Sequence, residues 1–216
     1  MGEEMPKYRK IDMENWPRRE HFNYYRNIIR CGYSLTSRLD VTKLYDFTKK
    51  ENKRFYGCFI YAASKAVNQM DSMRMMITED GTPGVWEHCY PNFTIFHEDD
   101  KTFSDIWTEY SDDFDEFYDR FEEVLDKYSA NKGIKARPNQ PANFFCISCA
   151  PWIDFEAYST HSVGDPALFP IMTFGKIREE GAKKTVPLTL TISHASADGY
   201  HAGELFRILQ EELNNF

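Results

Sequence analysis

The sequence predicts one α/β domain in which strands and helices follow one another without a fixed order. Two observations carry this expectation. Residues 186–193 alternate apolar and polar side chains, with the period of two that a half-buried strand shows. Residues 111–128 instead repeat aromatic and aliphatic side chains at helical intervals. No Pro-, Gly- or Ser-rich linker divides the chain, so we expect a single domain over residues 1–216.

Five segments have the helical spacing of apolar side chains. Pro17 suits the first turn of the first helix, with Asn15 or Trp16 near its cap. The acidic run in the fourth lacks the glycine and the oxygen-ligand spacing of a calcium loop, so we interpret its charges as a solvated face. The predicted helices cover residues 17–29, 41–50, 55–70, 111–128 and, after the Asp198-Gly199 turn, a stretch that reaches Leu213.

The remaining ordered segments alternate like strands. The last two are expected to form a hairpin with its turn at residues 179–182. The order of elements lacks the regular alternation of a doubly wound sheet, and neither G-x-G-x-x-G nor a phosphate loop occurs. The predicted strands cover residues 31–40, 73–77, 84–87, 92–97, 144–149, 168–177 and 186–193.

Composition excludes several classes of protein. Hydrophobic residues make up 42% of the chain, which allows a sizeable core and argues against disorder. The net charge of −8 argues against nonspecific binding of nucleic acid or of an anionic membrane surface. No apolar run approaches the roughly 20 residues of a membrane span, and the N-terminus lacks the apolar segment of a signal peptide. We therefore expect a cytoplasmic protein.

The five cysteines are odd in number and lack the spacing of a disulfide framework, which favours reduced thiols. Cys146 and Cys149 form a C-x-x-C motif, for which redox chemistry or zinc binding is the alternative. Redox pairs lie at the start of a helix, whereas this pair lies in a predicted strand. A structural zinc site would need a second pair, and none occurs. We expect neither a redox nor a metal role.

His194 is the candidate catalytic residue. It continues the parity of the apolar side chains of strand 186–193 and precedes Asp198 by four residues. Because an imidazole titrates at about pH 6.5, a half-sheltered histidine at a strand end can act as a general base. On the residues alone, a hydrogen-bonded packing role for His194 stays open.

Several segments resemble a known family. Residues 193–199, Ser-His-Ala-Ser-Ala-Asp-Gly, resemble the H-H-x-x-x-D-G signature of chloramphenicol acetyltransferases, with Ser193 in place of the first histidine. Residues 16–22 resemble the W-x-R-[KR]-E-[HY]-F segment of the same family. Further similar segments follow in the family order, so the resemblance extends from about residue 11 to residue 213. These segments are residues 31–37, 94–97, 102–104, 148–152 and 170–176.

The resemblance implies a fold, a reaction and catalytic residues. The fold is a two-layer sandwich of a mixed sheet with helices, assembled as a homotrimer with each active site between subunits. The reaction is acetyl transfer from acetyl coenzyme A to a hydroxyl of chloramphenicol, which confers antibiotic resistance. His194 is implied as the general base, Ser148 as the oxyanion donor and Thr173 as an assistant through water. Arg18 is implied to pair with Asp198, which keeps the turn at the strand end rigid.

The resemblance also implies binding residues, for which ordinary core packing is the alternative. Trp152 matches a tryptophan that lines the coenzyme tunnel. Arg54 and Lys176 stand where basic side chains can meet the phosphates of the coenzyme. An aromatic wall with one hydroxyl suits a small, partly apolar alcohol. Its residues are Tyr25, Ile29, Cys31, Phe96, Phe103 and Tyr158.

The departures from the family pattern fall on the pockets and leave His194 and Ser148 in place. They therefore bear on the acceptor more than on the reaction. Two alternatives stay open: the same acetyl transfer to another small hydroxyl compound, and a trimeric binding protein without catalysis. The residues that differ from the family pattern are Ser193, Cys146, Thr160 and Ile177. Thr160 stands where a leucine would line the acceptor site, and Ile177 replaces a tyrosine.

Overall fold

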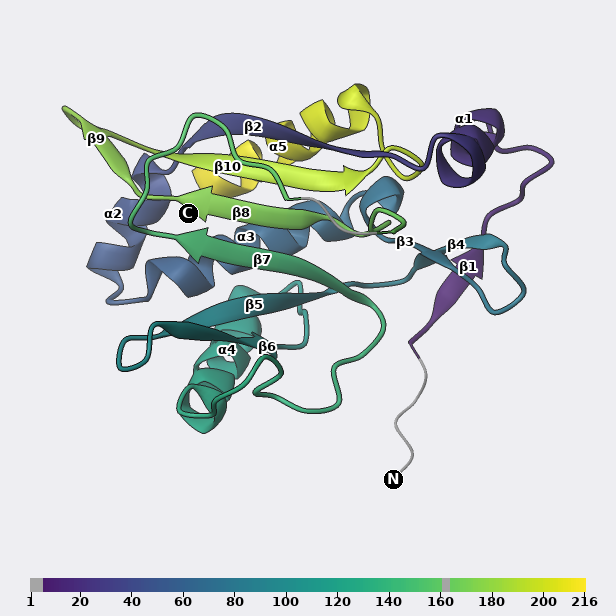
Figure 1. Ribbon diagram of the computed structural model, residues 1–216. Coiled ribbons are helices and arrows are strands. Elements are labelled where there is room, and N and C mark those ends of the chain that lie inside the picture. Colours follow the sequence, from purple (N-terminus) through teal and green to yellow (C-terminus); the bar gives the residue numbers. More distant parts are fainter. Residues whose placement is uncertain (1–5, 161–163) are drawn as a thin grey trace.

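The protein is described by a computed structural model that covers residues 6–160 and 164–216. A mixed seven-stranded sheet has the large helices packed on one face, which confirms the predicted two-layer α/β fold (Figure 1). Across the sheet the strands run in the order β2 (Gly32–Asp40), β10 (Lys183–Ser193), β8 (Ile171–Gly175), β7 (Phe144–Ala150), β5 (Tyr90–His97) and β6 (Thr102–Trp107), with β9 (Arg178–Glu180) paired to β10.

Strand β10 is the longest strand and lies inside the sheet. Its alternating side chains Val186, Leu188 and Leu190 are fully buried, as the period of two predicts. It is antiparallel to both β2 and β8, whereas β7 is parallel to β5 and β8. Strands β5, β7 and β8 therefore end at one edge of the molecule, and β10 ends at the opposite edge (Figure 1).

Four helices cover one face of the sheet. Helix α3 lies in the middle of this layer, where the Phe59 ring contacts the Phe174 ring of β8 at a centroid distance of 4.2 Å. This contact belongs to a core of buried apolar side chains contributed by both layers. The four helices are α2 (Thr42–Lys50), α3 (Phe55–Asn68), α4 (Phe114–Tyr128) and α5 (Gly199–Asn214).

A smaller group of elements lies beyond the end of β10. Helix α1 (Arg19–Asn23) continues into one π-helical segment (Tyr24–Ile28), and three short strands form a separate sheet in the order β1–β4–β3. Buried Phe22 and Met75 pack with Ala195, the second residue after β10. This second apolar cluster attaches α1 to the end of the strand. The short strands are β1 (Tyr8–Lys10), β4 (Pro83–Trp86) and β3 (Met75–Ile77), the last after a 3-10 turn (Asp71–Met73).

Some predicted boundaries were wrong. Helix α1 begins at Arg19 rather than at Pro17, because Arg18 takes the cap position and uses its side chain elsewhere. The turn of the last hairpin is Gly181-Ala182, where Gly181 adopts a positive φ of 62°. Strands β1 and β9 were not predicted, because three exposed residues are too few to show a period. Strand β6 was also not predicted as a strand.

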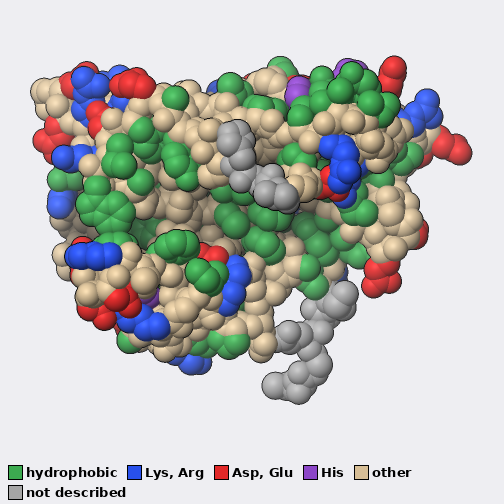
Figure 2. All heavy atoms as spheres, viewed as in Figure 1, with side chains coloured by type: hydrophobic (Ala, Val, Ile, Leu, Met, Phe, Trp, Pro, Cys, Tyr) green, Lys and Arg blue, Asp and Glu red, His purple; other side chains and the backbone are tan. Residues whose placement is uncertain are grey.

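No helix in the described ranges covers the opposite face of the sheet; the segment that follows β7 crosses part of it (Figure 1). Figure 2 views this face and shows hydrophobic side chains gathered along its middle. Phe96, Trp152 and Phe103 expose 36%, 59% and 50% of their surfaces, so aromatic surface is available here for a ligand or a partner. None of the described helices is long and apolar enough to cross a membrane.

Candidate active site

The turn after β10 displays His194. The carbonyl of Ser193 accepts hydrogen bonds from the backbone N–H groups of Ser196 (3.1 Å) and Ala197 (3.2 Å), and the Ser193 hydroxyl accepts one from Ala195 (3.2 Å). Strand pairing also continues past β10, since the His194 N–H donates to the carbonyl of Cys31 at 3.0 Å. The backbone of His194 is therefore held by the strand on one side and by the turn on the other.

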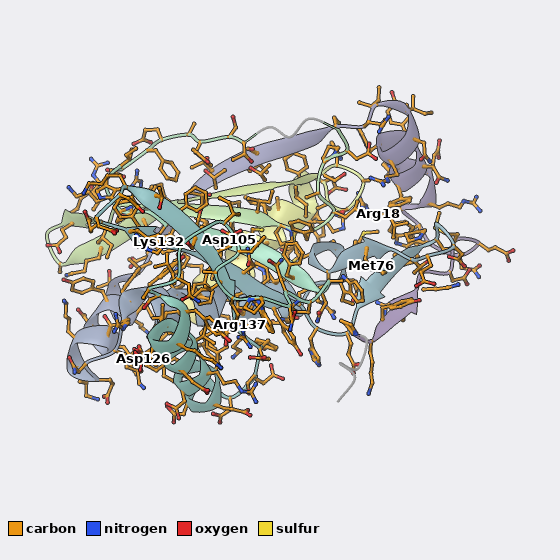
Figure 3. The ribbon with its side chains drawn as sticks, turned by 60° about the horizontal axis from the view of Figure 1, so that its bottom comes forward. Arg18, Met76, Asp105, Asp126, Lys132 and Arg137 are labelled. Carbon is orange, nitrogen blue, oxygen red and sulfur yellow. The ribbon has the colours of Figure 1, made fainter. Side chains whose placement is uncertain are left out.

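Arg18 binds this turn through its carbonyl oxygens. Its guanidinium donates to the carbonyls of Ser196 (2.6 Å), Ala195 (3.1 Å) and His194 (3.3 Å). Figure 3 shows Arg18 between α1 and the end of the sheet. The Arg18 Nε lies 3.7 Å from Asp198 Oδ2, so the two residues form an ion pair as well. The sequence pointed to the aspartate alone, whereas the structure gives Arg18 four partners.

Asp198 connects the turn to α5. Asp198 Oδ1 accepts from the backbone N–H groups of Tyr200 and His201, and the Asp198 N–H donates to His201 Nδ1 at 3.4 Å, which completes a capping box. The same Oδ1 lies 2.8 Å from His201 Nδ1. Burial by itself would raise the pKa of the Asp198 carboxyl, but the His201 hydrogen bonds and the charge of Arg18 outweigh burial and lower this pKa below 3.8. Asp198 is therefore ionised near neutral pH and serves as the cap of the helix.

We expect Arg18→Ala to lower the free energy of unfolding by about 3 kcal/mol, because it leaves three carbonyl oxygens and one half-buried carboxylate without their cation. Arg18→Lys keeps the charge but cannot reach all four acceptors with one ammonium group, so its loss should be intermediate. Chemical denaturation measures both variants. An Arg18→Ala protein as stable as the native protein would contradict this role.

The ring of His194 lies between two tyrosines. Tyr25 stacks on it at a centroid distance of 3.8 Å and an interplanar angle of 5°, and Tyr33 meets it edge-on at 5.2 Å and 66°. His194 Nδ1 is buried and has no hydrogen-bond partner in the part of the chain that the structure describes. Nε2 is therefore the ring nitrogen left to meet a substrate. Ile29 is exposed, and Cys31 is half-buried, at this same end of the sheet.

Ser148 and Thr173 lie together on the face of the sheet that no described helix covers, called the helix-free face below. They are paired residues of β7 and β8, and their hydroxyl oxygens are 3.1 Å apart. The row continues across the sheet through Thr189 of β10 to Thr36 of β2, whose hydroxyl oxygens are 2.6 Å apart. Since Ser148 is only half-buried, its hydroxyl can donate to a bound group while Thr173 fixes its orientation.

Within one chain, Ser148 and His194 are far apart. Thr189 is two strands from Ser148, roughly 10 Å at the usual strand spacing. Ser193 lies four residues further along β10, or roughly 13 Å. The Cα atoms of Ser148 and Ser193 are thus roughly 16 Å apart, too far for both side chains to contact one acyl carbon at about 3–3.5 Å.

Phe96, Phe103 and Trp152 lie at the other end of the sheet from His194. Phe96 and Phe103 are opposite each other on β5 and β6, and Phe96 packs edge-on against Trp152 at 4.6 Å. Tyr158 packs against Phe155 further along the segment that follows β7. The structure therefore groups Phe96, Phe103 and Trp152, and it separates them from Tyr25.

Gly175 lets the Trp152 segment approach the sheet. A Cβ atom at this position would lie 2.6 Å from the carbonyl oxygen of Ile153 and 2.9 Å from the Phe155 ring, so any larger residue would push the segment away. The next residue, Lys176, donates its backbone N–H to that carbonyl and exposes its side chain. Arg54, at the start of α3, is exposed but forms an ion pair with Glu122 at 3.1 Å.

The C-x-x-C cysteines lie within β7, as expected. Both thiols are free, and burial raises the pKa of Cys146 to about 11 and that of Cys149 to about 12. Neither thiol is activated as a nucleophile near neutral pH. Over the described ranges, no three His, Cys, Asp or Glu side chains come close enough to hold a metal ion.

Two residues beside His194 and Asp198, Tyr33 and His201, were not predicted as part of the site. His201 had a signal, because an Asp-x-x-His spacing before an apolar helix resembles a capping box. Tyr33 had none of its own, since its contact with His194 depends on the register that places Tyr33 opposite Ile192. Thr160, one of the residues that depart from the family pattern, is half-buried, and residues 161–163 after it lie outside the described residues.

Comparisons with known proteins agree over nearly the whole chain. A family model described as chloramphenicol acetyltransferase matches residues 6–210. A chloramphenicol acetyltransferase of Campylobacter coli is 37% identical over 208 residues, covering 96% of this chain and 99% of the relative. One of Vibrio anguillarum is 36% identical over 209 residues, covering 96% and 95%.

Solved structures show the same fold. A chloramphenicol acetyltransferase structure superposes with a TM-score of 0.84 at 22% identity, covering 96% of this chain and all of that chain. A dihydrolipoamide acetyltransferase of Azotobacter vinelandii superposes with a TM-score of 0.66 at 15% identity, covering 99% and 91%. With the family match and the sequence relatives, the conclusion is plain: the chain belongs to the chloramphenicol acetyltransferase family.

Proposed function

We propose that the protein transfers the acetyl group of acetyl coenzyme A to a hydroxyl of chloramphenicol and so confers resistance to this antibiotic. Relatives that align over almost their whole length carry the name of this activity. The observation that carries the proposal is the setting of His194, whose backbone is held by Cys31 and Arg18 and whose ring is held by Tyr25 with Nε2 left to react. A binding protein would have no need of this arrangement.

The chemistry follows from the groups present. Acetyl coenzyme A supplies a thioester, and an alcohol attacks it well only when its proton is removed. His194 Nε2 would accept that proton while the alcohol oxygen bonds to the acyl carbon, a contribution of about 10²- to 10⁴-fold. The resulting oxyanion would accept a hydrogen bond from Ser148, oriented by Thr173. The carbon–sulfur bond then breaks, and the protonated His194 returns its proton to the leaving thiolate.

We propose that each active site forms between two subunits of a homotrimer. The separation of His194 from Ser148 within one chain supports this, because a substrate cannot contact both. A second copy whose β10 end lies over the helix-free face would bring its own His194 opposite Ser148. The exposed Phe96 and Trp152 would then lie at a contact between subunits, which gives a reason for their exposure.

The pocket assignments follow this division. Trp152 would line the path of the coenzyme at the end of β7, with Lys176 and Arg54 toward its phosphates. Because Glu122 already pairs with Arg54, we expect Lys176 to contribute more to coenzyme affinity. The remaining side chains would wall the acceptor pocket, drawn from two subunits. They are Tyr25, Ile29, Cys31, Phe96, Phe103 and Tyr158.

A thiol-release assay tests the proposed function. Purified protein with acetyl coenzyme A should release free thiol only when chloramphenicol is added, with one acetyl ester formed for each thiol. If small alcohols were acetylated and chloramphenicol were not, the proposed acceptor would be wrong, whereas the proposed acetyl transfer would be correct. No turnover with any alcohol would overturn the enzymatic proposal.

A further inference from the structure

We infer that Tyr33 is a positioning residue: its ring, together with that of Tyr25, fixes the orientation of the His194 imidazole. The inference rests on the proposed role of His194 as the base. Tyr33 itself need not touch a substrate for this role. It would act only through the ring that it contacts.

The register of β2 and β10 brings Tyr33 to His194. Tyr33 pairs with Ile192, and Gly32 pairs with Ser193, so His194 is the diagonal neighbour of Tyr33 just past the end of the ladder. The two rings meet edge-on at 5.2 Å with an interplanar angle of 66°. Tyr25 is nearly parallel to the imidazole, at 5°. The imidazole is therefore bounded by two rings in different planes.

This confinement matters because no other described residue forms a hydrogen bond that orients the imidazole. A catalytic histidine is commonly oriented by a bond from Nδ1 to a carboxylate or a carbonyl. In the described part of the chain His194 Nδ1 has no such partner, although it is buried. The torsion that turns an imidazole is broad and has no strong preference of its own. Packing is then what restricts the ring, and rotation would require Tyr25 or Tyr33 to move.

The hydroxyl of Tyr33 takes no part in this role. It is buried without a hydrogen-bond partner among the described residues. Burial also raises its pKa to about 12, so it is a neutral phenol near neutral pH. Removing a buried hydroxyl that bonds to nothing carries no loss of a bond and relieves a desolvation cost. The aromatic body of Tyr33 is the part that contacts His194.

The test compares Tyr33→Leu with Tyr33→Phe. Leucine fills part of the space but removes the ring edge, so kcat should fall by up to about 100-fold with KM unchanged, as for a displaced base. Phenylalanine should keep the native kcat and at least the native stability. Leu39→Ala, on the same strand and away from His194, controls for loss of stability alone and should keep kcat.

An NMR measurement makes the test independent of turnover. The ring protons of His194, stacked on Tyr25, should be displaced by the ring current in the native protein and in Tyr33→Phe, and should move toward unstacked values in Tyr33→Leu. A native kcat and native ring shifts in Tyr33→Leu would overturn the inference. So would a loss of kcat in Tyr33→Phe as large as in Tyr33→Leu, or an equal loss in Leu39→Ala. If the native protein showed no turnover, the proposed function would fail while the ring shifts still decided the positioning.

Discussion

His194→Ala is expected to lower kcat by about 10³- to 10⁴-fold and to leave the fold and the assembly of the protein unchanged. The loss follows from the chemistry, because Asp198 and His201, the other proton acceptors beside the turn, are bonded to each other and Asp198 also pairs with Arg18, and positioned general bases contribute up to about 10⁴-fold. Stability should change little, since the backbone contacts with Cys31 and Arg18 do not involve the imidazole. Thiol release under saturating substrates measures kcat, and denaturation measures stability.

His21→Ala is the matched control, because His21 is an exposed histidine of α1 near the same end of the molecule. It should keep the native kcat. A His194→Ala protein that turns over at the native rate would rule out His194 as the base. Equal losses in both variants would instead point to damage of the α1 region.

Ser148→Ala is expected to lower kcat by about 10²- to 10³-fold, as for other lost oxyanion donors. KM for both substrates should change little, because the hydrogen bond forms to charge that develops only in the transition state. Thr173→Val should have a smaller effect, since it removes the hydroxyl that orients Ser148 and not the donor itself. Steady-state kinetics with both substrates varied separate kcat from KM.

Ser34→Ala provides the comparison for Ser148. The Ser34 hydroxyl is paired across strands with Thr191 at 2.6 Å, much as Ser148 is paired with Thr173, but it has no proposed part in the reaction. The Ser34→Ala variant should have the same kcat as the native protein. If Ser148→Ala kept the native kcat, another donor would have to stabilise the oxyanion.

Long periodic segments allowed most of the fold to be predicted. The alternation in residues 186–193 defined β10, and the spacing of Phe114, Phe117 and Phe121 defined α4, because each element buries one continuous face. Short edge strands such as β1 could not be predicted, because their three exposed residues bury no face and so show no apolar periodicity. The start of α1 was predicted at the wrong residue because the Arg18 side chain binds the turn after β10, a tertiary contact that local helix signals do not show.

Distances between candidate residues could not be predicted from sequence. The resemblance grouped Ser148 with His194, and only strand order and direction separate them, because β8 and β10 run in opposite directions. Three of the four acceptors of Arg18 could not be predicted for the same reason, since they are backbone carbonyls whose directions depend on the fold; only Asp198 was implied. Residue types thus indicated the chemistry, while the arrangement of the site needed the tertiary structure.

The central claim is that acetyl transfer needs His194 of one copy opposite Ser148 of another. Co-expression of His194→Ala and Ser148→Ala chains tests it, because a mixed trimer can then combine an intact His194 with an intact Ser148. With random mixing of equal amounts, about a quarter of the sites should be intact and kcat should recover to about that fraction of the native value. Activity that stays at the level of the two single variants would contradict a site shared between subunits.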